Sequence, residues 1–398
     1  MLSVEDALAR LLEGIGPTES ERVTLAASHG RVPADPTISA AMDVPPFPNS
    51  AMDGFAVRSA DGGAPRTLIG ESRAGGPPAP AVESGSAVRI MTGAPVPAGA
   101  DAIVPIEDAT EHGTGVSFTI DPVAGAHVRP AGLDVERGQA IALDRAPITS
   151  SAIGLLAAMG CAEMAVRRRP RVAILSTGDE LRDVGATLEP GQIFDANAPA
   201  LAAAVLEAGG EPVIIERAPD DRDVIEARIR DAVSGADLLV ASGGVSVGAH
   251  DHVRTVIEQL GFLEFWRIAV QPGKPLAFGR IGDTPVVGLP GNPVSALVTF
   301  ELFVRPMIRA LLGLAGDGRL RVSARVDEAI GKDPARRAYL RVRVDGRADG
   351  YRAASAGGQG SSQMLPLASA NALLVVPEGA AATEAGARYD AILLGPPA

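Results

Sequence analysis

The sequence is poor in several kinds of residue, and each shortage excludes a class of protein. A single cysteine, Cys161, rules out an internal disulfide framework and a cysteine-rich metal site. Aromatic residues make up only 3% of the 398 residues, so the cores must be built from Ala, Val, Leu and Ile. Positive charge is also scarce. The net charge of −12 argues against a general surface for nucleic acid or anionic membranes, and an anionic substrate would need a local basic pocket.

Long apolar runs are missing as well. No run reaches membrane-spanning length, and the N-terminus carries Glu5 and Asp6 without a signal-peptide pattern. We therefore expect a cytoplasmic protein that acts on neither membranes nor nucleic acid. The length predicts two to four domains. The 46 glycines and 32 prolines indicate many turns in a globular chain.

The pattern of apolar residues changes along the chain. Ser3 is typical of a helix cap, and an apolar stripe follows it. Residues 44–143 have short apolar runs between Gly and Pro, which indicates a small, mostly β domain. From Arg171 strands alternate with helices, which predicts a parallel, doubly wound sheet. After Gly313 the strands are short and alternating, which predicts a small C-terminal β domain.

These patterns predict individual elements. Strands are expected at 172–175, 213–215, 238–241, 286–289, 319–326, 339–344, 373–376 and 391–394. Helices are expected at 148–164, 198–208, 223–233, 250–260 and 293–312.

The segment 237–251 organises the α/β part. Its apolar run is typical of a strand buried on both faces, and a Gly/Ser turn separates it from the next helix. Ligands of such sheets bind at the carboxyl ends of strands, where glycine allows close approach of the backbone. The candidate binding residues of this turn are Ser242, Gly243, Gly244, Ser246 and Gly248. An ordinary tight turn explains two glycines about equally well.

Two acidic residues, Asp179 and Glu180, follow the first strand of this region. Carboxylates with water and substrate phosphate are the ligands that Mg²⁺ prefers. Taken alone, an acidic first helical turn is the better explanation of the pair.

The segment 289–295 ends the last strand and begins the long helix. Pro293 suits a first helical turn and Asn292 a cap, while free N–H groups and the Ser295 hydroxyl would face an oxyanion. A well-formed helix start explains Asn292 and Pro293 equally well, but not Pro290 and Gly291 before them.

Other turns carry single polar residues. Lys274 lies between prolines in the segment 271–275, and a lysine held in this way suits a phosphate or oxyanion. Asp53, Thr92 and Asp134 lie in Gly-containing turns of residues 44–143, and each alone is typical of a simple turn.

Together these segments resemble the MoeA/gephyrin E-domain family, the molybdopterin molybdenumtransferases. Six segments match in the family's order and extend over most of the chain. They are PPFPNSAMDGFAV (45–57), IMTGAP (90–95), STGDEL (176–181), SGGVSVG (242–248) with Asp251, QPGKP (271–275) and LPGNPVSA (289–296).

The resemblance implies a subunit with four parts. They are an extended helical dimerisation segment (1–43 and 144–169), an inserted mostly-β domain (44–143), a MogA-like α/β molybdopterin-binding domain (170–315) and a C-terminal β barrel (316–398). It implies a homodimer whose cleft joins one subunit's α/β domain to the other's inserted domain. The activity implied is Mg²⁺-dependent insertion of molybdate into the dithiolene of adenylylated molybdopterin, with release of AMP. Partners implied are MogA-type and downstream cofactor enzymes.

The resemblance also assigns roles to residues. Those that match the family's functional acids and its threonine are Asp53, Thr92, Asp134, Glu180, Asp220 and Asp251. Those that match its molybdate-contacting positions are Lys274, Ser295, Arg341 and Ser361, and Arg343 is the alternative to Arg341 if the alignment slips.

The chain departs from some members, which have Lys where it has Gln271 and Arg267. Gln271 removes a positive charge from the oxyanion pocket, although its amide can donate, and tungstate remains an alternative to molybdate. Two other functions stay open at this point. One is a MogA-like adenylyltransferase, and the other is a gephyrin-like binding scaffold.

Overall fold

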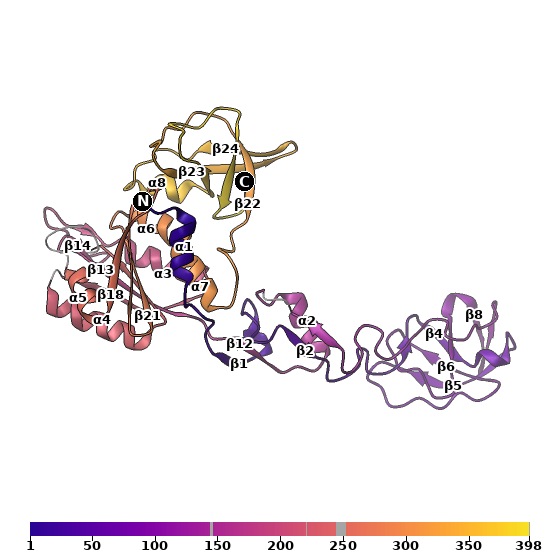
Figure 1. Cartoon of the computed structure of the whole chain (residues 1–398). Coiled ribbons are helices and arrows are strands. Elements are labelled where there is room, and N and C mark those ends of the chain that lie inside the picture. The colour runs from indigo at the N-terminus through magenta and orange to yellow at the C-terminus, as the bar shows by residue number, and fades with distance from the viewer. Residues whose placement is uncertain (144–145, 220, 244–251, 398) are drawn as a thin grey trace. The chain divides into compact units, whose positions relative to one another are not determined.

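The computed structural model describes residues 1–143, 146–219, 221–243 and 252–397. The chain forms two compact units. The large unit contains residues 1–21 and 167–398, and the small unit contains residues 22–166 (Figure 1).

The large unit is built on a six-stranded sheet with the strand order β16-β13-β17-β21-β20-β18. Its strands are β13 (Arg171–Thr177), β16 (Glu211–Ala218), β17 (Leu238–Ser242), β18 (Phe262–Arg267), β20 (Pro275–Ile281) and β21 (Thr284–Leu289). The pairings among β16, β13, β17 and β21 are parallel, as the sequence predicts, whereas β20 and β18 continue the sheet antiparallel. The hairpin of β20 and β21 turns at Gly282 and Asp283, a two-residue signal that was present in the sequence.

Helices cover both faces of this sheet, so it is doubly wound. One face carries α1 (Val4–Leu12), α3 (Asn197–Glu207), α6 (Pro293–Thr299) and α7 (Arg305–Leu311), and the other carries α4 (Arg222–Gly235) and α5 (His252–Leu260). Successive residues of β13 serve the two faces in turn. Ile174 belongs to the first core, and Ala173 and Leu175 belong to the second.

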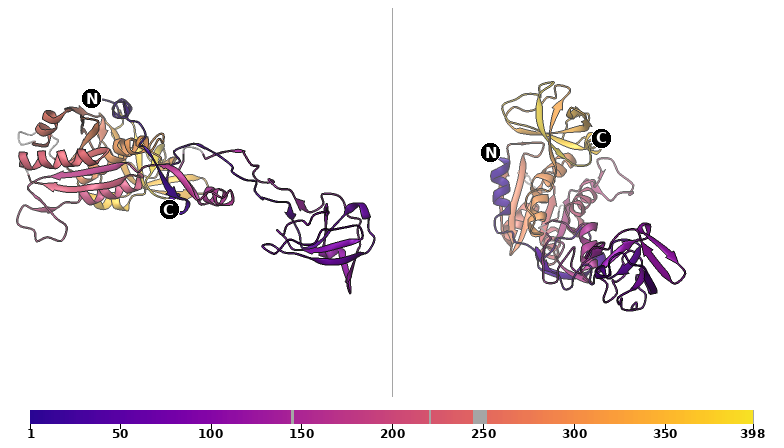
Figure 2. Two further views of the ribbon diagram at one scale, coloured as in Figure 1. Left: turned by 90° about the horizontal axis from the view of Figure 1, so that it is seen from below. Right: turned by 90° about the vertical axis from the view of Figure 1, so that its right-hand side faces the viewer.

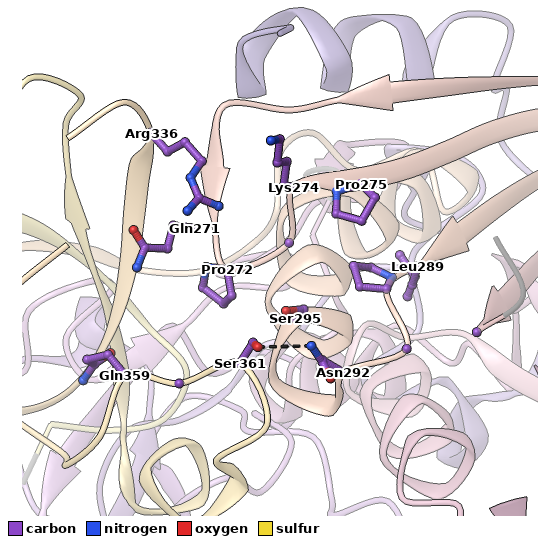
Figure 3. A pocket seen from close by; sticks show the side chains of 15 residues that line it. Gln271, Pro272, Lys274, Pro275, Leu289, Asn292, Ser295, Arg336, Gln359 and Ser361 are labelled. Carbon is purple, nitrogen blue, oxygen red and sulfur yellow. Dashed lines mark hydrogen bonds between the residues drawn. The ribbon is translucent and has the colours of Figure 1, made fainter. Parts of the chain in front are cut away.

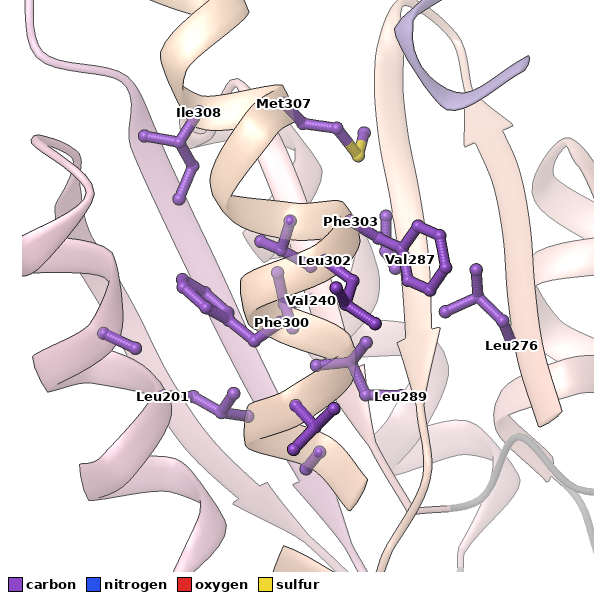
Figure 4. Close-up of a cluster of buried hydrophobic side chains, with 14 of the residues drawn as sticks. Leu201, Val240, Leu276, Val287, Leu289, Phe300, Leu302, Phe303, Met307 and Ile308 are labelled. Carbon is purple, nitrogen blue, oxygen red and sulfur yellow. The ribbon is translucent and has the colours of Figure 1, made fainter. Parts of the chain in front are cut away.

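The predicted long helix contains a wide turn. A π-helical turn, Phe300–Val304, lies between α6 and α7. Pro306 follows it, and proline inside a regular helix lacks an N–H group and crowds the preceding turn, which the wider turn relieves. Phe300 and Phe303 project from this turn into the core, Phe303 beside Val287 and Phe300 on the side of Leu201 (Figure 4).

The first helix packs on its own chain. The Ser3 hydroxyl accepts a hydrogen bond from the Asp6 N–H at 3.0 Å, so the predicted cap is confirmed. Val4, Ala7 and Leu11 are buried in the same core as α7.

A five-stranded barrel follows the α/β part. Its strands are β22 (Arg321–Val326), β23 (Arg337–Arg347), β24 (Gly350–Ser355), β25 (Ala372–Val376) and β26 (Arg388–Leu393), with the helix α8 (Met364–Ser369) before β25. The pairing of β23 with β25 closes the sheet β23-β24-β22-β26-β25 on itself. The strand β19 (Val270–Gln271) pairs with the start of β23 and ties the barrel to the segment that carries Lys274.

The small unit is mostly β structure (Figure 2). A six-stranded sheet has the order β7-β4-β6-β5-β9-β8, and three two-stranded sheets pair β1 with β12, β10 with β3 and β11 with β2. The elements are β1 (Ser20–Thr24), η1 (Leu25–Ser28), β2 (Thr37–Ser39), β3 (Asn49–Ser50), β4 (Gly54–Val57), η2 (Ser59–Asp61), β5 (Arg66–Ser72), β6 (Ser86–Ile90), β7 (Ala102–Pro105), η3 (Ile106–Asp108), β8 (Ala109–His112), β9 (Gly115–Phe118), β10 (Val128–Arg129), β11 (Ala140–Ala142), α2 (Ser150–Ala158) and β12 (Glu163–Arg167).

The helix predicted at 148–164 is shorter than expected. α2 ends at Ala158, because Gly160 adopts a positive φ of 79°, and residues from Glu163 onward form a strand. The alternation of polar and apolar residues in 163–167, with the β-branched Val166, was the signal that the helical prediction missed. None of the helices within the described ranges is long and apolar enough to span a membrane.

Candidate functional site

A pocket of about 620 Å³ lies in the large unit, at the carboxyl ends of β17 and β21 (Figure 3). Turns of the α/β part and loops of the barrel build it together. Its lining residues are Gly243, Gln271, Pro272, Gly273, Lys274, Pro275, Leu289, Pro290, Gly291, Asn292, Ser295, Arg336, Gln359, Gly360 and Ser361. Three turns predicted from the sequence, at Gly243, at residues 271–275 and at residues 289–295, therefore meet at one pocket, as expected for ligand sites in open α/β sheets.

Glycine is required where these turns pack closely. Gly243 has a φ of +81°, and a Cβ there would lie 2.6 Å from the Thr177 carbonyl oxygen. Gly273 has a φ of +110°, and a Cβ there would lie 2.3 Å from Cγ2 of Thr299. Side chains at these positions would push the turns apart, so both glycines fix the shape of the pocket.

Asn197, which the sequence analysis did not select, joins two of the turns. Its Nδ2 donates to the Ser242 hydroxyl at 2.7 Å and to the Gly291 carbonyl at 2.8 Å. Asp195 holds Asn197 in place, because its Oδ1 accepts from the backbone N–H groups of Asn197 and Ala198 at 3.0 and 3.1 Å. An acidic residue just before a helix was the available signal, but it predicts a cap and no link between distant turns.

The start of α6 is tied to the barrel. Asn292 occupies the cap position, as predicted, but its side chain makes no capping bond. Its Nδ2 donates instead to the Ser361 hydroxyl at 3.1 Å, and the Val294 N–H donates to the Ser361 carbonyl at 3.2 Å. The predicted binding residues Asn292, Ser295 and Ser361 thus line one wall, while Pro293 occupies the first helical position outside the lining.

Among the described residues, the two charged side chains that line the pocket are both cations. Lys274 is exposed, and its side chain makes no hydrogen bond or ion pair with any residue in the described ranges. Arg336 is the other cation, and no Asp or Glu of residues 1–143, 146–219, 221–243 and 252–397 belongs to the lining. Arg267 is also positively charged, but it is exposed and lies outside the lining. It therefore does not replace the positive charge that is missing at Gln271.

Arg341 lies behind the pocket wall. Its side chain is 1% exposed, and its Nη2 donates to the carbonyl oxygens of Gly358 and Gly360, each at 3.1 Å. Its Nε has no hydrogen-bond partner among the described residues, and burial lowers the pKa of the guanidinium. Arg343, the alternative position, is exposed on the same strand and does not line the pocket. Arg341 therefore supports the loop that carries Ser361.

The predicted metal-binding acids lie at the end of β13. Asp179 and Glu180 are exposed, and the buried hydroxyls of Ser176 and Thr177 before them have no hydrogen-bond partner within the described part of the chain. The described residues contain no group of three or more potential metal ligands. Two exposed carboxylates nevertheless fit Mg²⁺, because this ion is commonly held by one or two carboxylates and completed by water and substrate phosphate.

The small unit brings two predicted residues together. Oδ1 of Asp53 accepts hydrogen bonds from the Thr92 hydroxyl and from the Thr92 N–H, both at 2.7 Å. These two bonds, the hydroxyl first, lower the pKa of the Asp53 carboxyl. Two motifs whose key residues are 39 positions apart therefore meet at the surface, where they hold the Asp53 carboxylate in its ionised form. Asp134 is exposed, and its backbone N–H donates to the Val44 carbonyl oxygen and not to Asp53 or Thr92.

Several candidates lie outside the described residues. They are Asp220, Gly244, Ser246, Gly248 and Asp251.

Comparisons with known proteins cover nearly the whole chain. A profile for the MoeA N-terminal region (domain I and II) matches residues 2–160, one for a probable molybdopterin binding domain matches 173–310, and one for the MoeA C-terminal region (domain IV) matches 323–394. A molybdopterin molybdenumtransferase of Haemophilus influenzae is 42% identical over 79% of this chain and 78% of its own length. Molybdopterin molybdenumtransferase 2 of Mycobacterium tuberculosis is 39% identical over 89% of this chain and 90% of its own.

The chain belongs to the MoeA family of molybdopterin molybdenumtransferases. The crystal structure of a MoeA protein from Pyrococcus horikosii agrees, with 32% identity, a TM-score of 0.86 and full coverage of both chains. The resemblance drawn from the six segments is thereby confirmed. So is the predicted fold class, with its α/β domain, inserted β domain and C-terminal barrel.

Proposed function

We propose that this MoeA family member is a molybdopterin molybdenumtransferase, a transferase of molybdenum cofactor biosynthesis. It inserts molybdate into the dithiolene of adenylylated molybdopterin and releases AMP. One observation carries the proposal: in an acidic chain, with a net charge of −12, the charged residues among the described lining of the pocket are the cations Lys274 and Arg336. Such a pocket suits a small oxyanion.

The predicted molybdate contacts fit this pocket. The Lys274 ammonium supplies a positive charge, and the hydroxyls of Ser295 and Ser361 supply donors within the same lining. Arg341 positions Ser361 through the carbonyls of Gly358 and Gly360. We assign Ser242, Gly243 and the turn from Pro290 to Pro293 to the binding of the molybdopterin nucleotide. Gly244, Ser246 and Gly248, which follow Gly243 in the sequence, are proposed for the same role on the sequence alone.

The acids have a separate role in the proposal. Asp179 and Glu180 hold Mg²⁺, which polarises the pyrophosphate link so that AMP becomes a better leaving group. Hydrogen bonds from Thr92 lower the pKa of the Asp53 carboxyl, so Asp53 stays ionised and accepts hydrogen bonds from donor groups of the substrate. Asp134, Asp220 and Asp251 are proposed as further functional acids on the resemblance alone.

The proposal is tested by reconstitution of cofactor from adenylyl-molybdopterin, molybdate and Mg²⁺. Lys274→Ala and Asp53→Ala are expected to fold with unchanged circular dichroism and melting temperature, but to assemble no cofactor. Arg343→Ala is the matched control, since this arginine is exposed outside the pocket. Wild-type activity of Lys274→Ala would contradict the proposal.

We propose in addition that the protein is a cytoplasmic homodimer that works with MogA-type and downstream cofactor enzymes and binds neither nucleic acid nor membranes. Complementation tests the shared cleft that the resemblance implies. Inactive Asp53→Ala and Lys274→Ala chains are co-expressed. In a mixed dimer one of the two clefts combines an intact Asp53 with an intact Lys274, so up to half of the wild-type activity should return. Absence of any recovery, with mixed dimers confirmed by tandem affinity tags, would contradict a cleft shared between subunits.

The four-part division is proposed with the boundaries 1–43 with 144–169, 44–143, 170–315 and 316–398. The closed barrel, which begins at Arg321, supports the last boundary. Limited proteolysis with mass spectrometry tests the division, and first cuts inside β13 or β23 would contradict it.

A further inference from the structure

We propose that Arg336 is a further anion-binding residue of the pocket, and that with Lys274 it supplies the second positive charge that Gln271 does not. Its ligand is an oxyanion of the molybdate class. The inference deepens the proposed function and rests on it.

The contacts of Arg336 orient its guanidinium. Its Nε and Nη2 each lie 2.7 Å from Oδ2 of Asp333, and its side chain is 25% exposed. Its Nη1 makes no hydrogen bond with any described residue, and Arg336 lines the pocket together with Lys274. Figure 3 shows Arg336, Gln271 and Lys274 toward one end of the pocket. One edge of the planar group is therefore fixed, and the remaining donors are left for a ligand.

Gln271 is linked to this arrangement. Its Oε1 accepts a hydrogen bond from the Asp333 N–H at 2.8 Å, while its NH₂ group has no partner among the described residues. A lysine at this position could not make the bond, because an ammonium group has no acceptor. Gln271 thus holds the loop that presents Arg336 and adds a neutral donor. The charge that some family members have at position 271 is supplied here by position 336.

Asp333 both positions and weakens the arginine. Its pKa is lowered by the hydrogen bond from the Ala335 N–H and then by Arg336, so the carboxylate is ionised at neutral pH. Its negative charge offsets part of the field of Arg336 in the pocket. The pair is partly exposed, at 25% and 37%, and exposed pairs contribute little to stability.

If Arg336 binds the anion, removing Arg336 and removing Asp333 should change the anion affinity in opposite directions. A purely structural ion pair does not predict this difference. Arg336→Gln removes the charge and should weaken anion binding. Asp333→Asn keeps a side chain that can accept from Ala335 and the backbone N–H that bonds Gln271, but removes the opposing charge, and should strengthen anion binding. If the pair served only to hold the loop, both variants would weaken binding.

Calorimetric titration of the full chain with sodium molybdate tests the inference. We expect Arg336→Gln to weaken binding roughly tenfold, as loss of a charge-assisted hydrogen bond does, and Arg336→Lys to weaken it less. Asp333→Asn should tighten binding about threefold, with a steeper salt dependence. Arg347→Gln is the matched control. Arg347 also pairs with an aspartate, Asp345 at 3.4 Å, but both residues lie on β23 outside the pocket.

The outcomes separate this inference from the proposed function. Affinity of Arg336→Gln within twofold of wild type, with Lys274→Ala strongly weakened, would overturn the role of Arg336 alone. Equal weakening by Arg336→Gln and Asp333→Asn would show a structural pair and overturn it as well. No binding of molybdate by the wild-type chain would overturn the proposed function and the inference together. Melting temperatures of all variants check that each one folds.

Discussion

Two regions of the large unit bury arginine in different ways. Near α7, Arg305 and Arg319 both bind Glu301, with Arg305 Nε 2.7 Å from Oε2 and Arg319 Nη2 2.8 Å from Oε1. Glu207 adds a second, more exposed carboxylate. Behind the pocket, Arg341 is 1% exposed, and among the described residues its guanidinium donates to carbonyl oxygens and to no carboxylate. The positive charges near α7 are neutralised by carboxylates of the protein, whereas the described residues provide no carboxylate partner for the positive charge of Arg341.

The difference separates a structural from a functional use of charge. A buried cation without a counter-ion costs free energy, and the cost falls when an anion binds nearby. The Glu301 cluster is complete without a ligand, and it joins α7, α3 and the segment before the barrel. The Arg341 region gains most when the pocket is filled. The two regions should therefore respond oppositely to mutation, one in stability and the other in binding.

The largest expected effect is on stability, from Glu301→Gln. The change removes the carboxylate that both Arg305 and Arg319 contact, and leaves their guanidinium groups buried beside a neutral amide. We expect the free energy of unfolding to fall by about 3 kcal/mol. Urea denaturation followed by circular dichroism measures it. Glu258→Gln is the control, since Glu258 pairs with Arg254 on an exposed helix face, and should cost less than about 0.5 kcal/mol. Equal effects of the two changes would contradict the comparison.

The same cluster predicts an acid dependence. Burial alone would raise the pKa of Glu301, but hydrogen bonds from Arg319 and Arg305 more than offset it, and the pKa lies below its ordinary value of 4.5. A lowered pKa in the folded state means that the contribution is complete above pH 4.5 and is lost as the pH falls through the folded-state pKa. The stability difference between wild type and Glu301→Gln should thus be constant from neutral pH to about pH 5 and shrink below it. A constant difference down to pH 3 would contradict the assignment.

The opposite response is expected from Arg341→Met. Methionine has similar length without the buried charge, so the free energy of unfolding should change by less than about 1 kcal/mol although two hydrogen bonds are lost. Molybdate affinity should fall roughly tenfold, because the charge and the support of Gly360 are removed. Added molybdate should raise the melting temperature of the wild type more than that of the variant. A stability loss as large as that of Glu301→Gln, with unchanged affinity, would reverse the roles of the two regions.

The sequence predicts the parts of this comparison unequally. Periodicity places the parallel strands and most helices, because burial on two faces leaves long apolar runs such as 238–241. It does not place β18 and β20, whose residues lie among prolines and glycines. The motif of residues 289–296 indicates Ser295, but nothing in the neighbouring sequence reveals that Arg336 lines the pocket or that Asn197 joins two of its turns. The partners of Asn197 lie far along the chain, and so do most residues that line the pocket with Arg336, so only the folded sheet and barrel bring them together.

The smallest expected effect comes from Asn197, the neutral counterpart of Arg341 as a support of the pocket. Asn197→Leu keeps the approximate size of the side chain and adds no charge, but it cannot donate to the Ser242 hydroxyl or the Gly291 carbonyl. We expect a stability loss of about 1 kcal/mol and a several-fold rise in the KM for adenylyl-molybdopterin, with kcat changed less, because the loss loosens two binding turns and removes no charge from the anion site. Unlike Arg341→Met, the variant should keep its affinity for molybdate alone. If it lost that affinity too, the turns and the cations would form one cooperative unit, and the separation of neutral support from charged contact would be wrong.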